Sequence, residues 1–157
     1  MRELLADMEI PYAEWNAAIT IRRSRRSYDS SEIAPKLLSR MQTVCRDFRP
    51  FPGVRIKLTH ESIDTVLTGI TNSYGIIRGA TACLAFVGDM DDPHVQEKVG
   101  YTGEGIILEA TANGLNTCWI SGSFDRKAAS YLTGITTGFT LFLSRFGMCI
   151  KIFLAGL

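Results

Sequence analysis

Four arginines surround one serine in the segment IRRSRRSYDSSEI, with Arg22, Arg23, Arg25 and Arg26 placed around Ser24. Arginine presents several N–H donors in a planar fork that suits a phosphate group, and a serine hydroxyl can add one more hydrogen bond. Alternatively, the run is a solvated basic turn that complements the C-terminal dipole of the preceding helix. Composition leaves these two interpretations equal. A nucleic-acid patch is the weaker interpretation, because the run is short and isolated.

Other residues that could do chemistry stand alone. His60 and His94 have no serine, cysteine or carboxylate constellation beside them, so we expect neither to be catalytic. The cysteines are widely spaced, with no CxxC pair and no histidine at ligand spacing, which argues against a zinc site and a disulfide framework. They are Cys45, Cys83, Cys118 and Cys149. We therefore predict no metal site and no catalytic side chain.

The stretch that positions these residues is 99–125, VGYTGEGIILEATANGLNTCWISGSFD. Asp92-Pro93 supplies a helix start, with an N-cap acid followed by proline at the first helical position. The helix should run to about Asn113, and Gly114 should turn left-handed after it. Residues 115–120 are short and apolar, which predicts a buried strand that ends in a polar, glycine-containing loop.

Three glycines, Gly100, Gly103 and Gly105, lie inside this helix although each should cost about 1 kcal/mol relative to alanine. We expect close approach there, either by a crossing helix or, less favoured, by a cofactor. Apolar residues cover nearly the whole circumference of the helix. This pattern predicts that it is buried on most sides, inside a domain or between two subunits.

Hydrophobic periodicity predicts the remaining elements. The first helix carries the stripe Tyr12, Trp15 and Ile19. The expected elements are helices at 11–21 and 34–48 and strands at 54–59 and 82–87. Buried strands joined by a long helix indicate a crossover unit and an α+β or three-layer fold, with helices covering a mixed sheet.

Composition sets the wider class. A length of 157 residues predicts one domain, 1–157, and a formal net charge of +1 gives no electrostatic case for binding nucleic acid or a membrane. The N-terminal sequence mixes acids with apolar residues and has no continuous apolar core, so it does not predict a signal peptide. We therefore expect a cytoplasmic protein.

In combination, these segments resemble the FMN-dependent nitroreductase family, and most closely its TM-nitroreductase branch. The resemblance extends over about residues 12–135 in order. The motifs that carry it are RRSxR followed by Tyr28, SYGIIRGA at 73–80, LAFVGD at 84–89, and EKVGYTGEGIILEATANGLNTCWISG at 97–122. The glycine-bearing helix with its TCW segment is the most specific part.

The resemblance implies a nitroreductase-like three-layer α+β sandwich, with a central mixed or antiparallel sheet covered by helices. It also implies a homodimer with FMN in clefts at the subunit interface, in which the long helix is buried largely by its dimer mate. The cofactor-binding residues that it implies are Arg22, Arg23, Ser24 and Arg26 for the phosphate and ribityl groups, and Ile120, Ser121 and Gly122 for the loop that faces flavin N5.

The implied activity is ping-pong transfer, in which NADH or NADPH gives a hydride to the flavin and leaves, and an electron-poor acceptor such as a nitroaromatic compound or a quinone then takes it. No side chain need act as an acid or base. The alternative is a flavin-binding or merely dimerising relative without turnover, because its C-terminal segment is altered.

That segment, 136–157, departs from the family pattern. No acid occurs after residue 125, and the stretch GFTLFLSRFGMCIKIFLAGL is almost wholly apolar. Arg145 and Lys151 make it a poor transmembrane candidate. A buried hairpin and a segment foreign to the fold remain equal alternatives.

Overall fold

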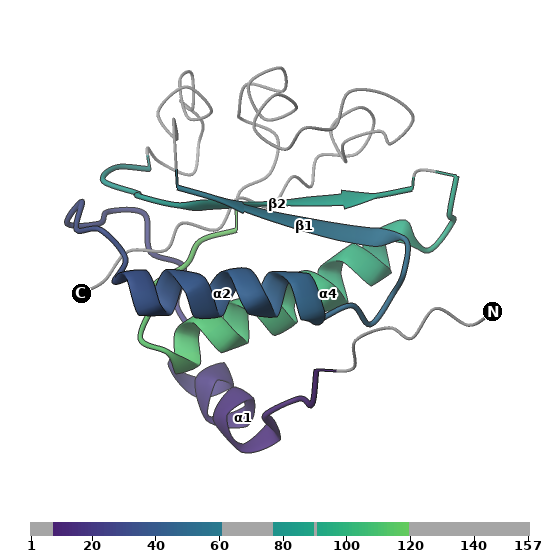
Figure 1. Cartoon of the computed structure of the whole chain (residues 1–157), viewed down its shortest axis with the longest axis horizontal. Helices are drawn as coiled ribbons and strands as arrows, with labels where there is room; N and C mark the ends of the chain where they lie inside the picture. Colours follow the sequence, from purple (N-terminus) through teal and green to yellow (C-terminus); the bar gives the residue numbers. More distant parts are fainter. Residues whose placement is uncertain (1–7, 61–76, 90, 120–157) are drawn as a thin grey trace.

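The computed structural model describes residues 8–60, 77–89 and 91–119. Within these ranges the chain forms three helices and a two-stranded antiparallel sheet. Helices α2 and α4 lie on one face of the strand pair, and α1 lies against α4 on the side away from the sheet (Figure 1). The elements are α1 (Tyr12–Ile21), α2 (Pro35–Asp47), β1 (Val54–Thr59), β2 (Cys83–Gly88) and α4 (Val95–Ala112).

The predicted α2 is confirmed. Pro35 occupies the first turn, where its missing N–H costs no hydrogen bond, and Phe48 caps the other end. The apolar side chains of this helix face inward, and the buried ones are Met41, Val44, Cys45 and Phe48. The helix therefore serves packing, as its regular period indicates.

Both predicted strands are present, with β2 one residue later than expected. They pair antiparallel in a register that places Val54 opposite Gly88 and Thr59 opposite Cys83. Every residue of β2 is buried, whereas β1 has exposed Arg55 between buried and half-buried neighbours. The described elements confirm the α+β class.

The start of α4 is corrected by two residues. The structure places the N-cap at His94, and Asp92 instead closes the turn before the helix. The Asp92 carboxylate accepts the backbone N–H of His94 at 2.9 Å and pairs with the Lys98 ammonium group. An aspartate before proline predicts a helix cap, but the side chain of Asp92 satisfies the preceding turn instead.

The end of α4 is as predicted. Gly114 has φ +80°, a left-handed conformation that glycine adopts without a Cβ penalty. The N–H of Leu115 reaches the carbonyl of Ala110 at 2.9 Å, and the N–H of Gly114 reaches that of Thr111 at 3.0 Å. This pair of bonds is a Schellman motif, which satisfies carbonyls that a helix C-terminus leaves open.

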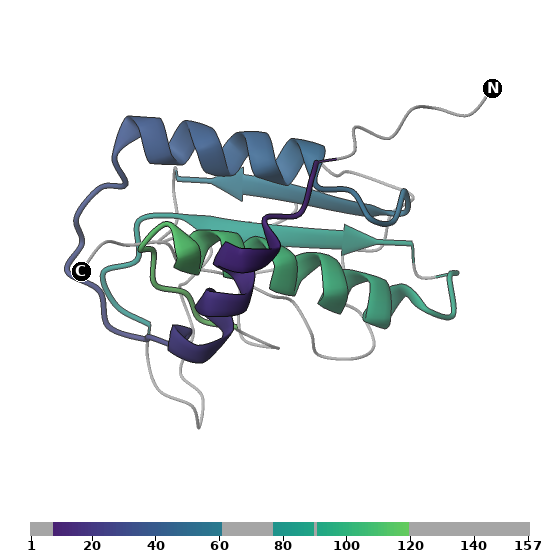
Figure 2. The ribbon, with the colours of Figure 1, turned by 90° about the horizontal axis from the view of Figure 1, so that it is seen from below.

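The chain itself buries nine of the 18 residues of α4, so these residues do not depend on a dimer mate for their burial. That a second copy covers the rest of the helix stays a prediction. A Cβ on Gly105 would lie 2.5 Å from the Phe48 ring and 3.0 Å from the Trp15 ring, and one on Gly103 would lie 2.5 Å from Trp119. Helix α1 crosses α4 here, as Figure 2 shows. The helix-crossing explanation is confirmed at Gly105.

The predicted apolar stripe of α1 is only partly buried. Trp15 lies in the core, but Tyr12 is 75% exposed and Ile19 is 60% exposed. Ala18, which the stripe omitted, is buried against the rest of the fold. Helix α1 therefore presents an apolar outer face in the single chain.

One buried acid joins the three helices. Glu109 of α4 is 2% exposed, and its Oε2 accepts the indole N–H of Trp15 in α1 at 2.8 Å. Its Oε1 accepts two bonds from Arg40 of α2, at 2.9 and 2.8 Å, and one from Asn113 at 3.0 Å. Both carboxylate oxygens thus have donors inside the fold.

Some expectations lie outside the described residues, among them the loop 120–122 and the apolar segment 136–157. The predicted strand at 115–120 is described up to Trp119, and within it Thr117 makes an isolated parallel bridge to Ser24. No helix in the described part of the chain is long and apolar enough to cross a membrane.

Candidate functional site

The arginine-rich segment is held in place by two distant parts of the chain. The N–H of Arg25 donates to the carbonyl of Thr117 at 2.9 Å, which forms the Ser24–Thr117 bridge. On the other side, Arg78 exchanges backbone bonds with Arg26 and Tyr28, both 3.0 Å long. Segments 22–28, 77–79 and 115–119 therefore meet at one place.

Gly79 allows one of these approaches. Its φ is +72°, and a Cβ at this position would lie 2.3 Å from the carbonyl oxygen of Tyr28. A side chain there would push the two backbones apart. The glycine of the IIRGA stretch thus keeps segment 77–79 against the arginine-rich segment.

Arg22 has an unusual environment. Its Nε lies 3.3 Å from Oε1 of Glu104, while its Nη1 is buried and has no hydrogen-bond partner. The Thr117 hydroxyl is likewise buried without a partner. A buried donor without an acceptor costs about 1–3 kcal/mol, so such atoms are uncommon in native proteins and mark sites where a ligand can supply the missing partner.

Ser24, Arg26 and Arg22 gather around the thiol of Cys118. Burial raises the pKa of this thiol, and the positive charges of Arg26 and Arg22, together with a hydrogen bond from Ser24, act in the opposite direction. Three of the side chains predicted to bind a phosphate therefore act on one buried thiol. Tyr28 borders the same region, and burial raises the pKa of its hydroxyl.

Arg23 is directed elsewhere. Its Nη1 donates to the carbonyl of Thr20 at 3.1 Å and to the carbonyl of Arg22 at 2.9 Å, at the C-terminal end of α1. These are the contacts that the alternative interpretation, a basic turn that complements a helix terminus, predicts for a cation. Arg23 keeps further donors on its guanidinium group.

Sequence reasoning missed Glu104. Its Oε2 accepts the indole N–H of Trp119 at 3.0 Å, while Oε1 faces Arg22. The signal was an acid between two glycines on an otherwise apolar helix face, but nothing local in the sequence indicates its partners. Thr117 was missed as well, because a threonine in a short apolar segment resembles an ordinary strand residue.

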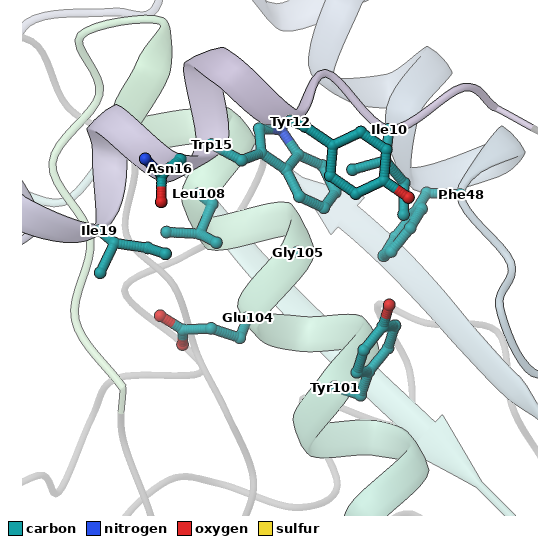
Figure 3. Close-up of a pocket in the computed structure, with 10 residues that line it drawn as sticks. All are labelled: Ile10, Tyr12, Trp15, Asn16, Ile19, Phe48, Tyr101, Glu104, Gly105 and Leu108. Atoms are coloured by element: carbon teal, nitrogen blue, oxygen red, sulfur yellow. The ribbon is translucent and has the colours of Figure 1, made fainter.

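A groove of about 330 Å³ lies between α1 and α4, and Glu104 is one of the residues that line it. Figure 3 shows Tyr12, Trp15, Phe48 and Tyr101 around it, with the Glu104 carboxylate turned away from Tyr101. Its lining is mainly aromatic and aliphatic. The groove is therefore suited to an apolar occupant, unlike the cationic site around Arg22.

The other candidate residues stay apart from this site. His94 lies 3.1 Å from Glu97 on the first turn of α4, and His60 is exposed at the end of β1. Cys45 is a buried free thiol, and burial raises its pKa to about 12. Across residues 8–60, 77–89 and 91–119, no group of three or more histidine, cysteine, aspartate or glutamate side chains could hold a metal ion.

The fold resembles solved nitroreductases. A nitroreductase family protein from Clostridium novyi NT superposes with a TM-score of 0.65 at 16% identity, over 95% of this chain and 86% of that one. A nitroreductase with bound FMN from Desulfitobacterium hafniense DCB-2 gives 0.64 at 14% identity, over 96% and 90%. One in complex with FMN from Exiguobacterium sibiricum 255-15 gives 0.64 at 13% identity, over 90% and 87%. Identities this low show the fold alone.

No curated protein matches the chain significantly. The family model described as "Putative TM nitroreductase" matches residues 14–143. This range includes the arginine-rich segment, both strands and the whole of α4, and it is well over half of the 157 residues. The chain therefore belongs to the nitroreductase family.

Proposed function

We propose that this protein is an FMN-dependent oxidoreductase that passes a hydride from NADH or NADPH to an electron-poor acceptor, such as a nitroaromatic compound or a quinone, in ping-pong order. Family membership supports the oxidoreductase class, and the relatives from D. hafniense and E. sibiricum are described with FMN. The observation that carries the proposal is the buried, unpartnered Nη1 of Arg22, in a segment whose Ser24 and Arg26 act on the buried Cys118 together with Arg22.

The chemistry of the site fits FMN. A phosphate carries acceptor oxygens and negative charge, which match the unpartnered N–H donors of Arg22 and the cationic surroundings of Cys118. The ribityl hydroxyls could satisfy the orphaned Thr117 hydroxyl, since a hydroxyl both donates and accepts. We assign phosphate and ribityl binding to Arg22, Arg23, Ser24 and Arg26.

The proposal includes the loop Ile120, Ser121 and Gly122 as the backbone that borders the flavin ring. These residues lie outside the described part of the chain, and the support is their place in the family motif, directly after Trp119. Bound FMN supplies the hydride chemistry. The polypeptide binds the cofactor and orients it, and we assign no side chain as a catalytic acid or base.

We also propose that the chain folds as a three-layer sandwich and assembles as a homodimer. The exposed large apolar residues of the described chain all lie on α1 and α4, and they are Tyr12, Ile19, Ile21 and Tyr101. Such a cluster around an apolar groove favours burial by a partner surface. A second copy is the occupant we infer, because the same face on two chains gives a self-complementary contact.

The test of the function is spectroscopic. The purified protein, reconstituted with FMN, should show flavin absorption that bleaches when NADH or NADPH is added without oxygen and returns when a quinone or nitroaromatic compound follows. A protein that takes up no FMN would refute the proposal. A protein that binds FMN but is reduced by neither nicotinamide would instead indicate the alternative, a flavin-binding relative without turnover.

The first prediction concerns the phosphate site. Arg22→Ala or Arg26→Ala should each weaken FMN binding about thirtyfold, because losing a charge-assisted partner of the bound phosphate costs about 2 kcal/mol. FMN titrations that follow the quenching of flavin fluorescence give the dissociation constant.

Arg25→Ala is the matched control. It removes the same charge from the same run, but it leaves the backbone bond from Arg25 to Thr117 in place. We expect it to change the FMN dissociation constant by less than about threefold, because the charges that act on Cys118 at the site are those of Arg22 and Arg26. Equal losses from all three variants would show that net charge, and not a defined pair of contacts, binds the cofactor.

A further inference from the structure

Glu104 is an acid placed beside a site that the proposed function assigns to a phosphate. Its carboxylate is used on both sides, with Oε1 3.3 Å from Nε of Arg22 and Oε2 3.0 Å from Nε1 of Trp119. A negative charge near a bound phosphate is electrostatically unfavourable. Its presence there therefore calls for a compensating role.

The two contacts of Glu104 suggest that role. An arginine side chain has many rotamers, and fixing it costs conformational entropy that binding must otherwise supply. The contact at Nε fixes the guanidinium group at one edge, while Nη1 stays buried and without a partner. A pre-oriented donor loses less freedom when a ligand binds.

Trp119 holds the Glu104 carboxylate at its second oxygen, Oε2. Its ring packs on Gly103, where a Cβ would lie 2.5 Å from the indole, and it also stacks near Phe86 of β2 with ring centres 6.1 Å apart. Glu104, one residue after Gly103, thus receives a hydrogen bond from a ring that cannot easily move. Trp119 also directly precedes residues 120–122.

We propose that Glu104 is a positioning residue for FMN: it holds Arg22 through Nε so that Nη1 remains available to the cofactor phosphate, and it couples that orientation to Trp119. This inference rests on the proposed function. It also predicts the direction in which FMN affinity changes when the negative charge is removed. Removing the negative charge should weaken FMN binding, whereas simple electrostatics predicts that it would strengthen it.

The central experiment is the FMN titration of Glu104→Gln. The amide keeps the size of the side chain, but its NH2 group cannot accept a bond from Arg22 or Trp119, so one of the two contacts is lost. We expect an FMN dissociation constant about tenfold higher, the effect of losing one charge-assisted contact. Unchanged or tighter binding would overturn the inference.

Glu97→Gln is the matched control. It makes the same charge change on the first turn of the same helix, where Glu97 is exposed and pairs only with His94 among the described residues. Its FMN dissociation constant should equal that of the wild-type protein. A tenfold rise in this variant too would attribute the effect to helix charge and contradict the positioning role.

A double-mutant cycle separates positioning from general damage to the fold. In the Arg22→Ala background the orientation of Arg22 no longer matters, so adding Glu104→Gln should change the FMN dissociation constant by less than about twofold. An additional tenfold loss in that background would show that Glu104 acts through the fold and would overturn the inference.

Trp119→Phe tests the second contact. It keeps an aromatic ring over Gly103 but removes the indole N–H. We expect a smaller loss of FMN affinity, about threefold. In the Glu104→Gln background, adding Trp119→Phe should cause no further loss of FMN affinity. Full additivity would contradict the coupling. Wild-type protein that fails to bind FMN would refute the proposed function itself, whereas wild-type binding weakened by Arg22→Ala and not by Glu104→Gln would refute only the role of Glu104.

Discussion

Glu109 shows how one residue can hold several elements. Burial by itself raises the pKa of its carboxyl group, but hydrogen bonds from Trp15, Arg40 and Asn113 and the charge of Arg40 outweigh this and hold the pKa below its usual range. The carboxylate is therefore charged in the core at neutral pH. Removing it would leave the Trp15 indole N–H buried without an acceptor.

The second prediction follows from this network. Glu109→Ala should lower the free energy of unfolding by about 3 kcal/mol, near the lower end for breaking a buried pair, because Arg40 is half exposed and can return to water. Urea denaturation followed by circular dichroism measures this. Arg46→Ala, which breaks an exposed pair with Asp47, is the control and should cost less than about 0.5 kcal/mol. Equal costs would contradict the structural role of Glu109.

The same carboxyl group makes the free energy of unfolding depend on pH in the acidic range. Its pKa is lower in the folded protein than in the unfolded chain, so the unfolded state binds its proton first as the pH falls. The stabilisation is complete above the unfolded pKa of about 4.3 and is lost as the pH falls through the lower folded pKa. Between pH 6 and pH 3, the wild-type protein should therefore lose more unfolding free energy than Glu109→Gln.

Composition alone identified the phosphate-binding hypothesis at Arg22 and Ser24, because four arginines in five residues are a local signal. It could not identify Glu104 or Glu109. The partners of Glu109 include Trp15, 94 residues away, and no short-range pattern encodes such a contact. It also could not separate Arg23, which turns back to the end of α1, from its neighbours.

At the scale of the elements, periodicity predicted both short helices and both strands to within a residue or two. The apolar stripe of α2 and the alternation of β1 are direct consequences of helical and strand repeats. The start of α4 was less predictable, because Asp92 can serve a helix cap or a turn equally well, and its contacts with His94 and Lys98 decide for the turn. The segment at 115–119 pairs with the arginine-rich segment through Thr117, a long-range contact that the sequence does not reveal.

The third prediction compares Gly100, inside α4, with Gly114, directly after the C-cap of α4. A Cβ at Gly100 or at Gly114 would meet nothing within 4 Å, so neither substitution creates a clash. Gly100→Ala should raise the free energy of unfolding by about 0.5–1 kcal/mol, because alanine favours the helix interior. Gly114→Ala should lower it by about 1 kcal/mol, because its φ of +80° disfavours a Cβ.

Urea denaturation of Gly100→Ala and Gly114→Ala under the same conditions measures these opposite changes in the free energy of unfolding. Gly105→Ala completes the series, since its Cβ would lie 2.5 Å from the Phe48 ring and should cost about 1–3 kcal/mol through overpacking. A stabilising Gly105→Ala would mean that the rings of Phe48 and Trp15 do not pack on Gly105 as closely as the structure shows.

At the scale of the whole molecule, the single chain leaves an apolar face on α1 and leaves Tyr101 of α4 exposed. The fourth prediction is that Ile19→Glu turns the proposed homodimer into a monomer, because a charge would then lie in the apolar contact around the groove. Light scattering coupled to gel filtration gives the mass. Gln42→Glu, on the exposed face of α2, is the control and should leave the mass unchanged. A wild-type protein with the mass of a single chain would refute the proposed homodimer.

The hydrogen bond between Trp15 and Glu109 also has a consequence for biosynthesis. A ribosome that adds about 5–20 residues per second needs roughly 5–20 s to make the 94 positions between them. During that interval α1 has been translated but cannot reach its place on α4, and the arginine-rich segment likewise waits for Thr117. The first helix to leave the ribosome is thus among the last to dock. The nascent chain exposes an indole and several aliphatic side chains throughout, which makes it a candidate for chaperone binding.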